Sequence, residues 1–263
     1  SGFLFFYTTQ KKFKIKSLLK KKTIRLLIPF LLIGLFYLIP IRFIANYPPY
    51  ESTSLIRIIY SFLTVNDCGH LWFLPTLLGI FIIATVLIRM TKSKQSTLIC
   101  IVLMLYILSP YLSSFLLITS TKYLFFFFMG YFINQYGKQI FSIKAIYHGL
   151  ATLGILLIAY VLIFHNENRV VTTFTSITII ASLYYFMPHR TNRFILWLDK
   201  NSFGIYLFHS PLMYIIMNKF SIIAPPAILV PMNLIFGIGG SLIITYFLRA
   251  IKCSFVIGEK NDR

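Results

Sequence analysis

The sequence predicts an all-α protein, a polytopic transmembrane helix bundle of about eight helices preceded by an N-terminal helix stub. Hydrophobic residues make up 58% and charged residues 12% of the 263 residues, and the mean hydropathy is +0.80. A soluble domain is typically about 45–50% apolar and about 25% charged. A soluble globule of this length cannot bury so much apolar surface, which excludes a soluble enzyme, a disordered tail and a nucleic-acid-binding domain. Lipid is therefore expected to cover most of these side chains.

Eight apolar stretches are counted as spans, because a membrane-crossing helix needs about 17–25 apolar residues. They are, in order, Ile24–Ile41, Gly69–Ile88, Leu98–Ile118, the shorter Tyr123–Tyr136, Ala145–Phe164, Val170–Met187, Ser202–Asn218 and Ala224–Leu248. Before them, Gly2–Tyr7 runs directly into a lysine cluster and is expected to be the end of a helix that begins before Ser1. No soluble domain is attached, so a single integral-membrane domain is predicted over residues 1–263.

Positive charge alternates between the two sets of loops that these spans define. Residues 8–23 with Arg25, 89–97, 134–144, 188–201 and the tail from Arg249 carry 20 of the 25 Lys and Arg side chains, and the other loops carry 5. Because positively charged loops remain cytoplasmic, the first set and the C-terminus are predicted to face the cytoplasm. The longest exterior segment is then Arg42–Asp67, in which Tyr47–Tyr50 (YPPY) is predicted to be a turn.

The lysine run Lys11–Lys22 has two interpretations. It provides topogenic charge and attracts anionic lipid, or it is a landing site for an anionic cytosolic substrate such as coenzyme A. The cysteines give no further indication of function. They are three in number and widely spaced, with no CxxC motif or His/Cys cluster, so neither a disulfide framework nor a metal site is predicted.

The predicted span Ser202–Asn218 contains polar residues that lipid is expected to exclude. His209 lies nine residues from Lys200, or about 14 Å along a helix, near the middle of a hydrocarbon core about 30 Å thick. An ionisable residue at that depth indicates a functional site. Asp199, Ser202, Tyr206 and His209 share one helical face. This stripe either lines a functional path or makes interhelical hydrogen bonds that only pack the bundle, and the pattern leaves both open.

A second polar cluster, Asp67–Pro75 (DCGHLWFLP), lies at the exterior entrance of a predicted span. Trp72 suits the aromatic belt at the membrane interface. His70 either caps the entrance or takes part in a site, and the cluster by itself does not decide between these roles.

Several of these motifs resemble those of the acyltransferase family 3 proteins, bacterial membrane O-acyltransferases that modify cell-surface sugars. Gly69–Pro75 (GHLWFLP) resembles the HLWFLP signature of the family, most closely that of its fucose 4-O-acetylase-like branch, and Asn201–Pro211 (NSFGIYLFHSP) resembles its late S-x-x-I-Y-L-x-H helix. Ser1–Leu4 is similar to the SGFL that closes its second helix, Arg25–Pro29 to the R-x-x-x-P that opens its third, and Met129–Tyr131 to its F-x-G segment.

This resemblance implies a ten-helix fold whose first helix carries an Arg and a His on which transfer depends. No residue of this sequence corresponds to either. We therefore expect the first helix and the start of the second to be missing, and this chain alone to be inactive. The implied activity is transfer of an acyl group, chiefly acetyl, from cytosolic acyl-CoA to a hydroxyl of a cell-surface or lipid-linked sugar at the bacterial plasma membrane.

The resemblance also suggests roles for individual residues, with a histidine acting as general base on the sugar hydroxyl. His209 and His70 are the candidate catalytic residues, and Ser202, Tyr206 and Trp72 are candidates for the substrate path. The CoA phosphates are expected on cytoplasmic cations, with Arg25, Lys20, Lys21 and Lys22 as candidates. Acyl-CoA is a co-substrate and not a permanently bound cofactor, and the expected partners are the lipid bilayer, acyl-CoA and the sugar acceptor, with no nucleic acid.

A carrier or flippase for a polysaccharide precursor is the alternative function, because it too needs a polar path between helices. The sequence contains no evident inverted repeat and few paired charges, which favours the enzyme. A third interpretation is a structural partner without activity.

Overall fold

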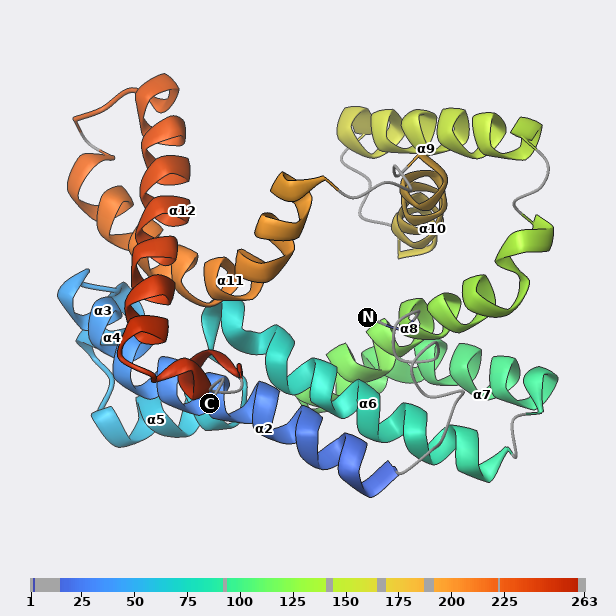
Figure 1. The fold of residues 1–263 in the computed structure, drawn as a ribbon, viewed down its shortest axis with the longest axis horizontal. Coiled ribbons are helices and arrows are strands. Elements are labelled where there is room, and N and C mark those ends of the chain that lie inside the picture. The colour runs from blue at the N-terminus through green and yellow to red at the C-terminus, as the bar shows by residue number, and fades with distance from the viewer. Residues whose placement is uncertain are drawn as a thin grey trace. The chain divides into compact units, whose positions relative to one another are not determined.

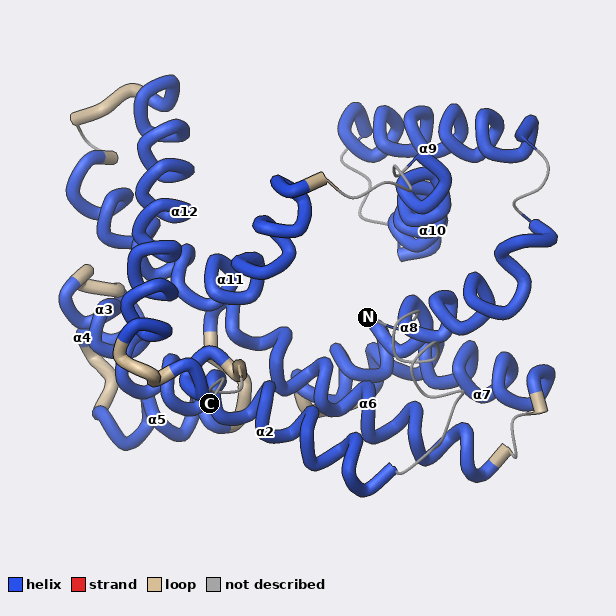
Figure 2. The backbone as a smooth tube through the Cα atoms, in the orientation of Figure 1, coloured by secondary structure: helices blue, strands red, loops and turns tan. Residues whose placement is uncertain are grey.

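The predicted all-α fold is confirmed. The computed structural model describes residue 2 and residues 15–91, 94–140, 144–164, 169–186, 192–221 and 223–259, and every regular element in these ranges is a helix (Figures 1 and 2). The chain divides into two compact units, one formed by Lys14–Leu124 and Arg193–Arg263 and the other by Ser1–Phe13 and Phe125–Asn192. The single domain expected from the sequence remains a prediction.

The first described helix is longer than the predicted span Ile24–Ile41. It consists of α2 (Ile15–Ile33), a π-helical turn η1 (Gly34–Leu38) and α3 (Ile39–Ile44). The π turn lies just before Pro40, which has no N–H and whose ring excludes the carbonyl four residues earlier. A π turn accommodates such a break within a continuous helix.

The predicted turn at Tyr47–Tyr50 is wrong, because Pro48–Glu51 forms a short helix, α4. Its two prolines occupy the first helical positions, where a missing N–H has no partner to lose. The chain reverses instead at Asn46, which has a positive φ of 47°. A further helix, α5 (Leu55–Leu63), follows, and the sequence analysis did not anticipate it.

The next helices correct one predicted span. After η2 (Gly69–Trp72) and α6 (Phe73–Met90), the predicted helix Leu98–Ile118 is interrupted, since α7 ends at Leu108. Pro110 is the second residue of the short 3-10 turn that follows and cannot donate the α-helical hydrogen bond at that point. These elements are α7 (Gln95–Leu108), η3 (Ser109–Tyr111) and α8 (Phe115–Ile140).

Two long helices complete this unit. The helices α11 (Arg193–Phe220) and α12 (Pro226–Ala250) pack against each other, and η4 (Ser254–Ile257) follows them (Figure 1). Small residues allow the two helices to approach closely: a Cβ built on Gly204 would lie 2.2 Å from the Thr245 hydroxyl oxygen, and one on Gly240 would lie 2.6 Å from Leu212 Cδ1. Such stripes of small residues are typical of packed membrane helices.

In the other unit, α9 (Lys144–Phe164) packs against α10 (Arg169–Phe186), close to the boundaries predicted for these two spans. Except for Gly2, the predicted stub Gly2–Tyr7 lies outside the described residues.

Four helical segments of the described chain are long and apolar enough to cross a membrane: Leu19–Ile44, Gly69–Met90, Phe115–Ile133 and Pro226–Ala250. Shorter apolar helical stretches occur at Gln95–Tyr111, Gly149–Tyr160 and Val170–Ile180. The chain is therefore a multi-pass membrane protein, while the count of eight spans remains a prediction.

Candidate functional site

Pro211 gives α11 an unsatisfied backbone carbonyl in the middle of the helix. A proline at position 211 cannot donate a hydrogen bond to the carbonyl of residue 207, four positions earlier. The ring of His70 occupies this place, with its Nε2 atom 3.0 Å from the Leu207 carbonyl oxygen. Because a carbonyl only accepts, Nε2 carries a proton, and in the neutral form of the ring Nδ1 is then the acceptor. The proline thus determines both where His70 binds and which tautomer it adopts.

A second hydrogen bond runs in the opposite direction between the same two elements. The Tyr206 hydroxyl on α11 donates to the His70 backbone carbonyl at 2.6 Å. Together the two bonds join η2 to α11 and orient the His70 ring, whose centroid lies 5.7 Å from that of Tyr206.

His209 is the second imidazole of the site, and its ring centroid lies 5.2 Å from that of His70. Its Nδ1 atom is 2.9 Å from the backbone carbonyls of Ile205 and Tyr206, so Nδ1 is the donor, and in the neutral form of the ring Nε2 is the acceptor. The Nδ1 atom of His70 is buried and has no hydrogen-bond partner among the described residues. Two neighbouring rings thus each donate one N–H to the backbone and keep an acceptor nitrogen.

Two of the residues predicted for the substrate path lie apart from this pair. Ser202 is exposed, and its hydroxyl donates to the Asp199 carbonyl of its own helix at 2.8 Å. Trp72 packs toward α8, with its ring 5.6 Å from Tyr123 and 6.2 Å from Phe115. Of the predicted polar stripe on α11, only Tyr206 and His209 meet His70.

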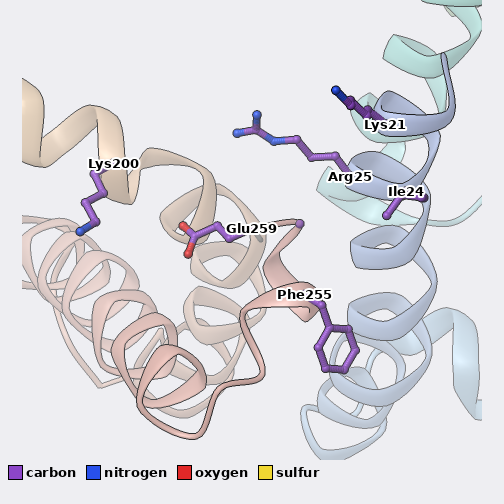
Figure 3. Close-up of a pocket in the computed structure, with 7 residues that line it drawn as sticks. Lys21, Ile24, Arg25, Lys200, Phe255 and Glu259 are labelled. Atoms are coloured by element: carbon purple, nitrogen blue, oxygen red, sulfur yellow. The ribbon is translucent and has the colours of Figure 1, made fainter. Parts of the chain in front are cut away.

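A basic pocket of about 580 Å³ lies near the predicted cytoplasmic ends of α2 and α11. Figure 3 shows Lys21 and Arg25 extending from α2 toward the elements that carry Lys200 and Glu259. The lining residues are Lys21, Ile24, Arg25, Lys200, Phe255, Gly258 and Glu259. Of the three cations, Lys21 and Arg25 were predicted from the sequence, whereas Lys200 and the contribution of the C-terminal segment were not.

The other two predicted phosphate-binding residues do not line this pocket. Lys20 is exposed, and the Lys22 Nζ atom lies 5.0 Å from the centre of the Phe81 ring on α6. Lys20 and Lys22 therefore belong to the lysine run Lys11–Lys22 but do not line the pocket.

The pocket is lined by three cations and a single carboxylate, and that carboxylate is already paired with Arg249, which lies outside the pocket lining. Arg249 binds both oxygens of Glu259, at 2.6 and 2.9 Å. The same guanidinium donates to the side-chain oxygen of Asn201 at 2.8 Å and to the Lys200 carbonyl at 3.0 Å. Lys21, Arg25 and Lys200 have no carboxylate partner in the described part of the chain.

A series of ring contacts leads from this pocket to the two histidines. The Arg25 guanidinium lies 5.9 Å from the centre of the Phe203 ring. Phe203 stacks with Tyr206, with centroids 6.2 Å apart and planes 23° apart, and Tyr206 lies 6.4 Å from His209. All of these residues belong to one compact unit, so the basic pocket and the imidazole pair are parts of one continuous arrangement.

Arg42, which the sequence analysis counted as an exterior loop charge, is a buried residue with 2% of its side chain exposed. It forms an ion pair with Asp67 at 2.8 Å, donates to the Tyr50 hydroxyl at 3.2 Å and lies 4.5 Å from the Tyr47 ring centre. Gly69, with a positive φ of 53°, leaves room for the guanidinium, because a Cβ there would lie 2.7 Å from Arg42 Nη2. This cluster holds the chain just before His70.

Burial also suppresses ionisation beside this cluster. It raises the pKa of the Tyr50 phenol above its ordinary value, and it raises the pKa of the Cys68 thiol to about 12. In the sequence, this cluster was indicated only by Arg42 and Asp67, which lie at the two ends of a largely apolar segment.

Fold and site together define a multi-pass helical membrane protein with two imidazoles between its helices and a basic pocket at one end. Residues 1–250 match a family model described as an acyltransferase domain, that of acyltransferase family 3. Because the match covers most of the chain, the chain belongs to this family and is a membrane acyltransferase. It has no significant match among curated proteins or among solved structures.

Proposed function

We propose that this acyltransferase moves an acyl group, chiefly acetyl, from cytosolic acyl-CoA to a hydroxyl of a cell-surface or lipid-linked sugar. The observation that carries the proposal is the continuous series of contacts from the basic pocket through Phe203 and Tyr206 to His209 and His70. It offers an anionic donor a binding site at one end and a proton acceptor at the other.

The donor phosphates bind Lys21, Arg25 and Lys200 in this proposal. Guanidinium and ammonium groups without carboxylate partners suit phosphate oxygens, which they bind through charge-assisted hydrogen bonds. The Phe255 side chain adds an apolar surface to the same pocket. The thioester then points along Phe203 and Tyr206 toward the imidazoles.

The transfer step needs a base, and both histidines keep an acceptor nitrogen for it. The hydroxyl oxygen of the sugar attacks the thioester carbonyl carbon while its proton passes to an imidazole nitrogen. The C–S bond then breaks, the thiolate takes up a proton and CoA leaves as the free thiol. His209 and His70 are proposed for the proton transfer, and Tyr206 orients His70 through its backbone carbonyl.

Donor binding is tested by comparing CoA with dephospho-CoA, which lacks the 3′-phosphate. Arg25→Ala and Lys21→Ala are each expected to weaken CoA binding by at least about tenfold, because a hydrogen bond to a charged group contributes about 1.5–3 kcal/mol and 1.4 kcal/mol corresponds to a factor of ten. The matched control is Lys20→Ala, which removes the same charge from the same helix outside the pocket and should leave CoA affinity unchanged. Equal effects of all three variants would mean that only the general positive charge matters.

Transfer is tested in a strain that lacks the gene by measuring O-acyl groups on the surface glycan by NMR. Complementation with the full-length gene is expected to restore the O-acyl signal, and its His209→Ala variant is expected to fail while its expression stays normal. A glycan precursor that accumulates inside the deletion strain, with unchanged acylation of the exported glycan, would instead support the carrier function.

A further inference from the structure

The lining of the basic pocket contains groups that phosphate binding does not need. The pocket volume of about 580 Å³ lies within the range of about 300–1,000 Å³ that is typical of sites for small molecules. Besides three cations, the lining includes two apolar side chains and one carboxylate, which are those of Ile24, Phe255 and Glu259. Phosphate oxygens bind the cations alone. The other side chains therefore indicate a ligand with a second part that is apolar on one surface and donates hydrogen bonds.

The apolar part of the pocket suits a flat aromatic ring. The Phe255 side chain is 49% exposed and the Ile24 side chain is 48% exposed, and both line the pocket. Phe255 belongs to η4, which packs against α2, the helix that carries Ile24 (Figure 3). An accessible phenylalanine ring beside cations is the arrangement with which proteins bind nucleotides, because the base stacks on the ring while the phosphates bind the cations.

Glu259 provides a hydrogen-bond acceptor whose orientation is fixed. Each of its two carboxylate oxygens accepts one hydrogen bond from Arg249. A carboxylate has about four acceptor positions, so two remain, and the side chain is 33% exposed. Figure 3 shows the carboxylate between Lys200 and Arg25, and it forms no ion pair with either in the described part of the chain. A fully ionised phosphate has no hydrogen to donate, so the ligand group that suits Glu259 is an N–H or O–H.

We propose that this pocket binds the nucleotide end of the donor and that Phe255 and Glu259 recognise its nucleoside. The proposal rests on the proposed function, in which the donor is acyl-CoA, whose nucleotide is a 3′-phosphorylated adenosine diphosphate. The phosphates bind Lys21, Arg25 and Lys200, and the adenine ring stacks on Phe255. The adenine amine or the ribose 2′-hydroxyl donates a hydrogen bond to Glu259. Phe255 and Glu259 thus determine which nucleotide the site accepts, and the three cations contribute affinity for any phosphate.

The test measures the binding of CoA and of nucleotide fragments to the full-length protein in detergent by calorimetry. Adenosine 3′,5′-bisphosphate should bind, and pyrophosphate, which has no nucleoside, should bind at least about tenfold more weakly. Inosine 3′,5′-bisphosphate lacks the amine, and 2′-deoxyadenosine 3′,5′-bisphosphate lacks the 2′-hydroxyl. One of these two analogues should bind at least about tenfold more weakly than the adenosine compound, because a hydrogen bond to a charged group is lost. The weaker analogue identifies the group that donates to Glu259.

Two variants assign the contacts to their side chains. Phe255→Ala should weaken binding of the adenosine compound at least about fivefold and leave pyrophosphate binding unchanged, because only the base stacks on the ring. The control Phe247→Ala removes an exposed phenylalanine outside the pocket lining and should change neither. Glu259→Gln should reduce the discrimination against the weaker analogue roughly fivefold, because a neutral acceptor replaces a charged one. The control Asp199→Asn neutralises an exposed acid of α11 outside the pocket lining and should leave the discrimination unchanged.

The outcomes separate this proposal from the proposed function. Binding of CoA without a loss for either analogue would overturn nucleoside recognition by Glu259 and leave the donor in place. Equal affinities for pyrophosphate and the adenosine compound would show that only phosphate is recognised and would also overturn it. Binding of the adenosine compound without binding of CoA would support the nucleotide site and contradict acyl-CoA as the donor. Absence of binding by all of these compounds would overturn both.

Discussion

The two ring nitrogens of His70 have different roles. The Nε2 atom binds the Leu207 carbonyl and so contributes to packing, while the buried Nδ1 atom is an acceptor that packing does not use. The sequence left open whether His70 caps a helix entrance or takes part in a site. The geometry gives it a structural bond and leaves one nitrogen for chemistry, so the two roles are separable by mutation.

Replacing His70 with glutamine separates these roles. The glutamine amide can donate to the Leu207 carbonyl in place of Nε2, but it provides no basic nitrogen in place of Nδ1. His70→Gln should keep near-normal thermal stability and lose about 10²- to 10⁴-fold in acyl transfer. His70→Leu should also lose about 1–3 kcal/mol of stability, because a buried carbonyl is left without a donor. Full activity of His70→Gln in the glycan assay would limit His70 to packing.

The Arg42 cluster predicts a stability effect that is separate from chemistry. Asp67→Asn leaves the buried guanidinium without a counter-charge, which should cost about 3 kcal/mol, at the lower end for buried pairs because Asp67 is 31% exposed. Denaturation of the purified protein in detergent measures the change. Arg57→Met, which removes an exposed positive charge from the same segment, is the control and should stay within about 0.5 kcal/mol of the parent. A similar loss in both variants would contradict the assignment.

At the scale of elements, Pro211 leaves the Leu207 carbonyl in the middle of α11 free to accept a hydrogen bond from His70. In Pro211→Ala the new N–H competes for the Leu207 carbonyl and displaces the His70 Nε2–H. We expect unchanged or higher thermal stability, because a proline inside a helix costs about 3 kcal/mol, together with lower acyl transfer.

Pro231→Ala is the matched control for this effect, since Pro231 also lies inside a long helix, α12, but not at the site. It should affect stability without lowering transfer. If both variants reduced transfer equally, helix flexibility and not the freed carbonyl would explain the loss.

The contact between α5 and α2 depends on the absence of a side chain at Gly34. In Gly34→Ala the new methyl group meets the Phe62 ring, so overpacking should lower stability by about 1–3 kcal/mol. Gly239→Ala on α12 adds the same group where no atom lies within 4 Å, and it should be neutral or slightly stabilising. Thermal denaturation of both variants in the same detergent provides the comparison.

At the scale of the whole molecule, the division of positive charge predicts the orientation in the membrane. Intact cells treated with an impermeant maleimide should label Ser52→Cys and should not label Cys253, because the strongly positive loops remain in the cytoplasm. The native Cys68 is unsuitable as an exterior reporter, since it is buried and its pKa is raised to about 12. Labelling of Cys253 before cell lysis would reverse the predicted orientation.

The fold class was predictable because it depends on composition and hydropathy, which act on every residue. The boundaries of α9, α10 and α12 followed for the same reason, since each is bordered by polar residues or proline. The break between α7 and α8 was missed because apolar residues continue on both sides of Pro110. Helix α5 was missed because nine residues are too few for a span and hydropathy reports no packing partner.

The site was predictable only in part, because its geometry depends on contacts between distant parts of the chain. The depth of His209 in the predicted helix indicated a site, but its neighbour His70 is 139 residues away and is held beside it by the carbonyl that Pro211 leaves free and by the Tyr206 hydroxyl. Lys21 and Lys200 likewise share a pocket that no local pattern describes. Long-range pairing of this kind is a property of the folded chain and not of a motif.

The pocket wall formed by the last described segment has a consequence for evolution. The match to the family ends at residue 250, whereas Phe255, Gly258 and Glu259 line the basic pocket and Gly258, at φ 66°, packs against the Arg25 backbone. Substitutions in this tail would change the charge and size of the pocket without altering any residue in the matched range. Under the proposed function, changes confined to this tail would therefore alter donor preference while the transmembrane helices stay the same.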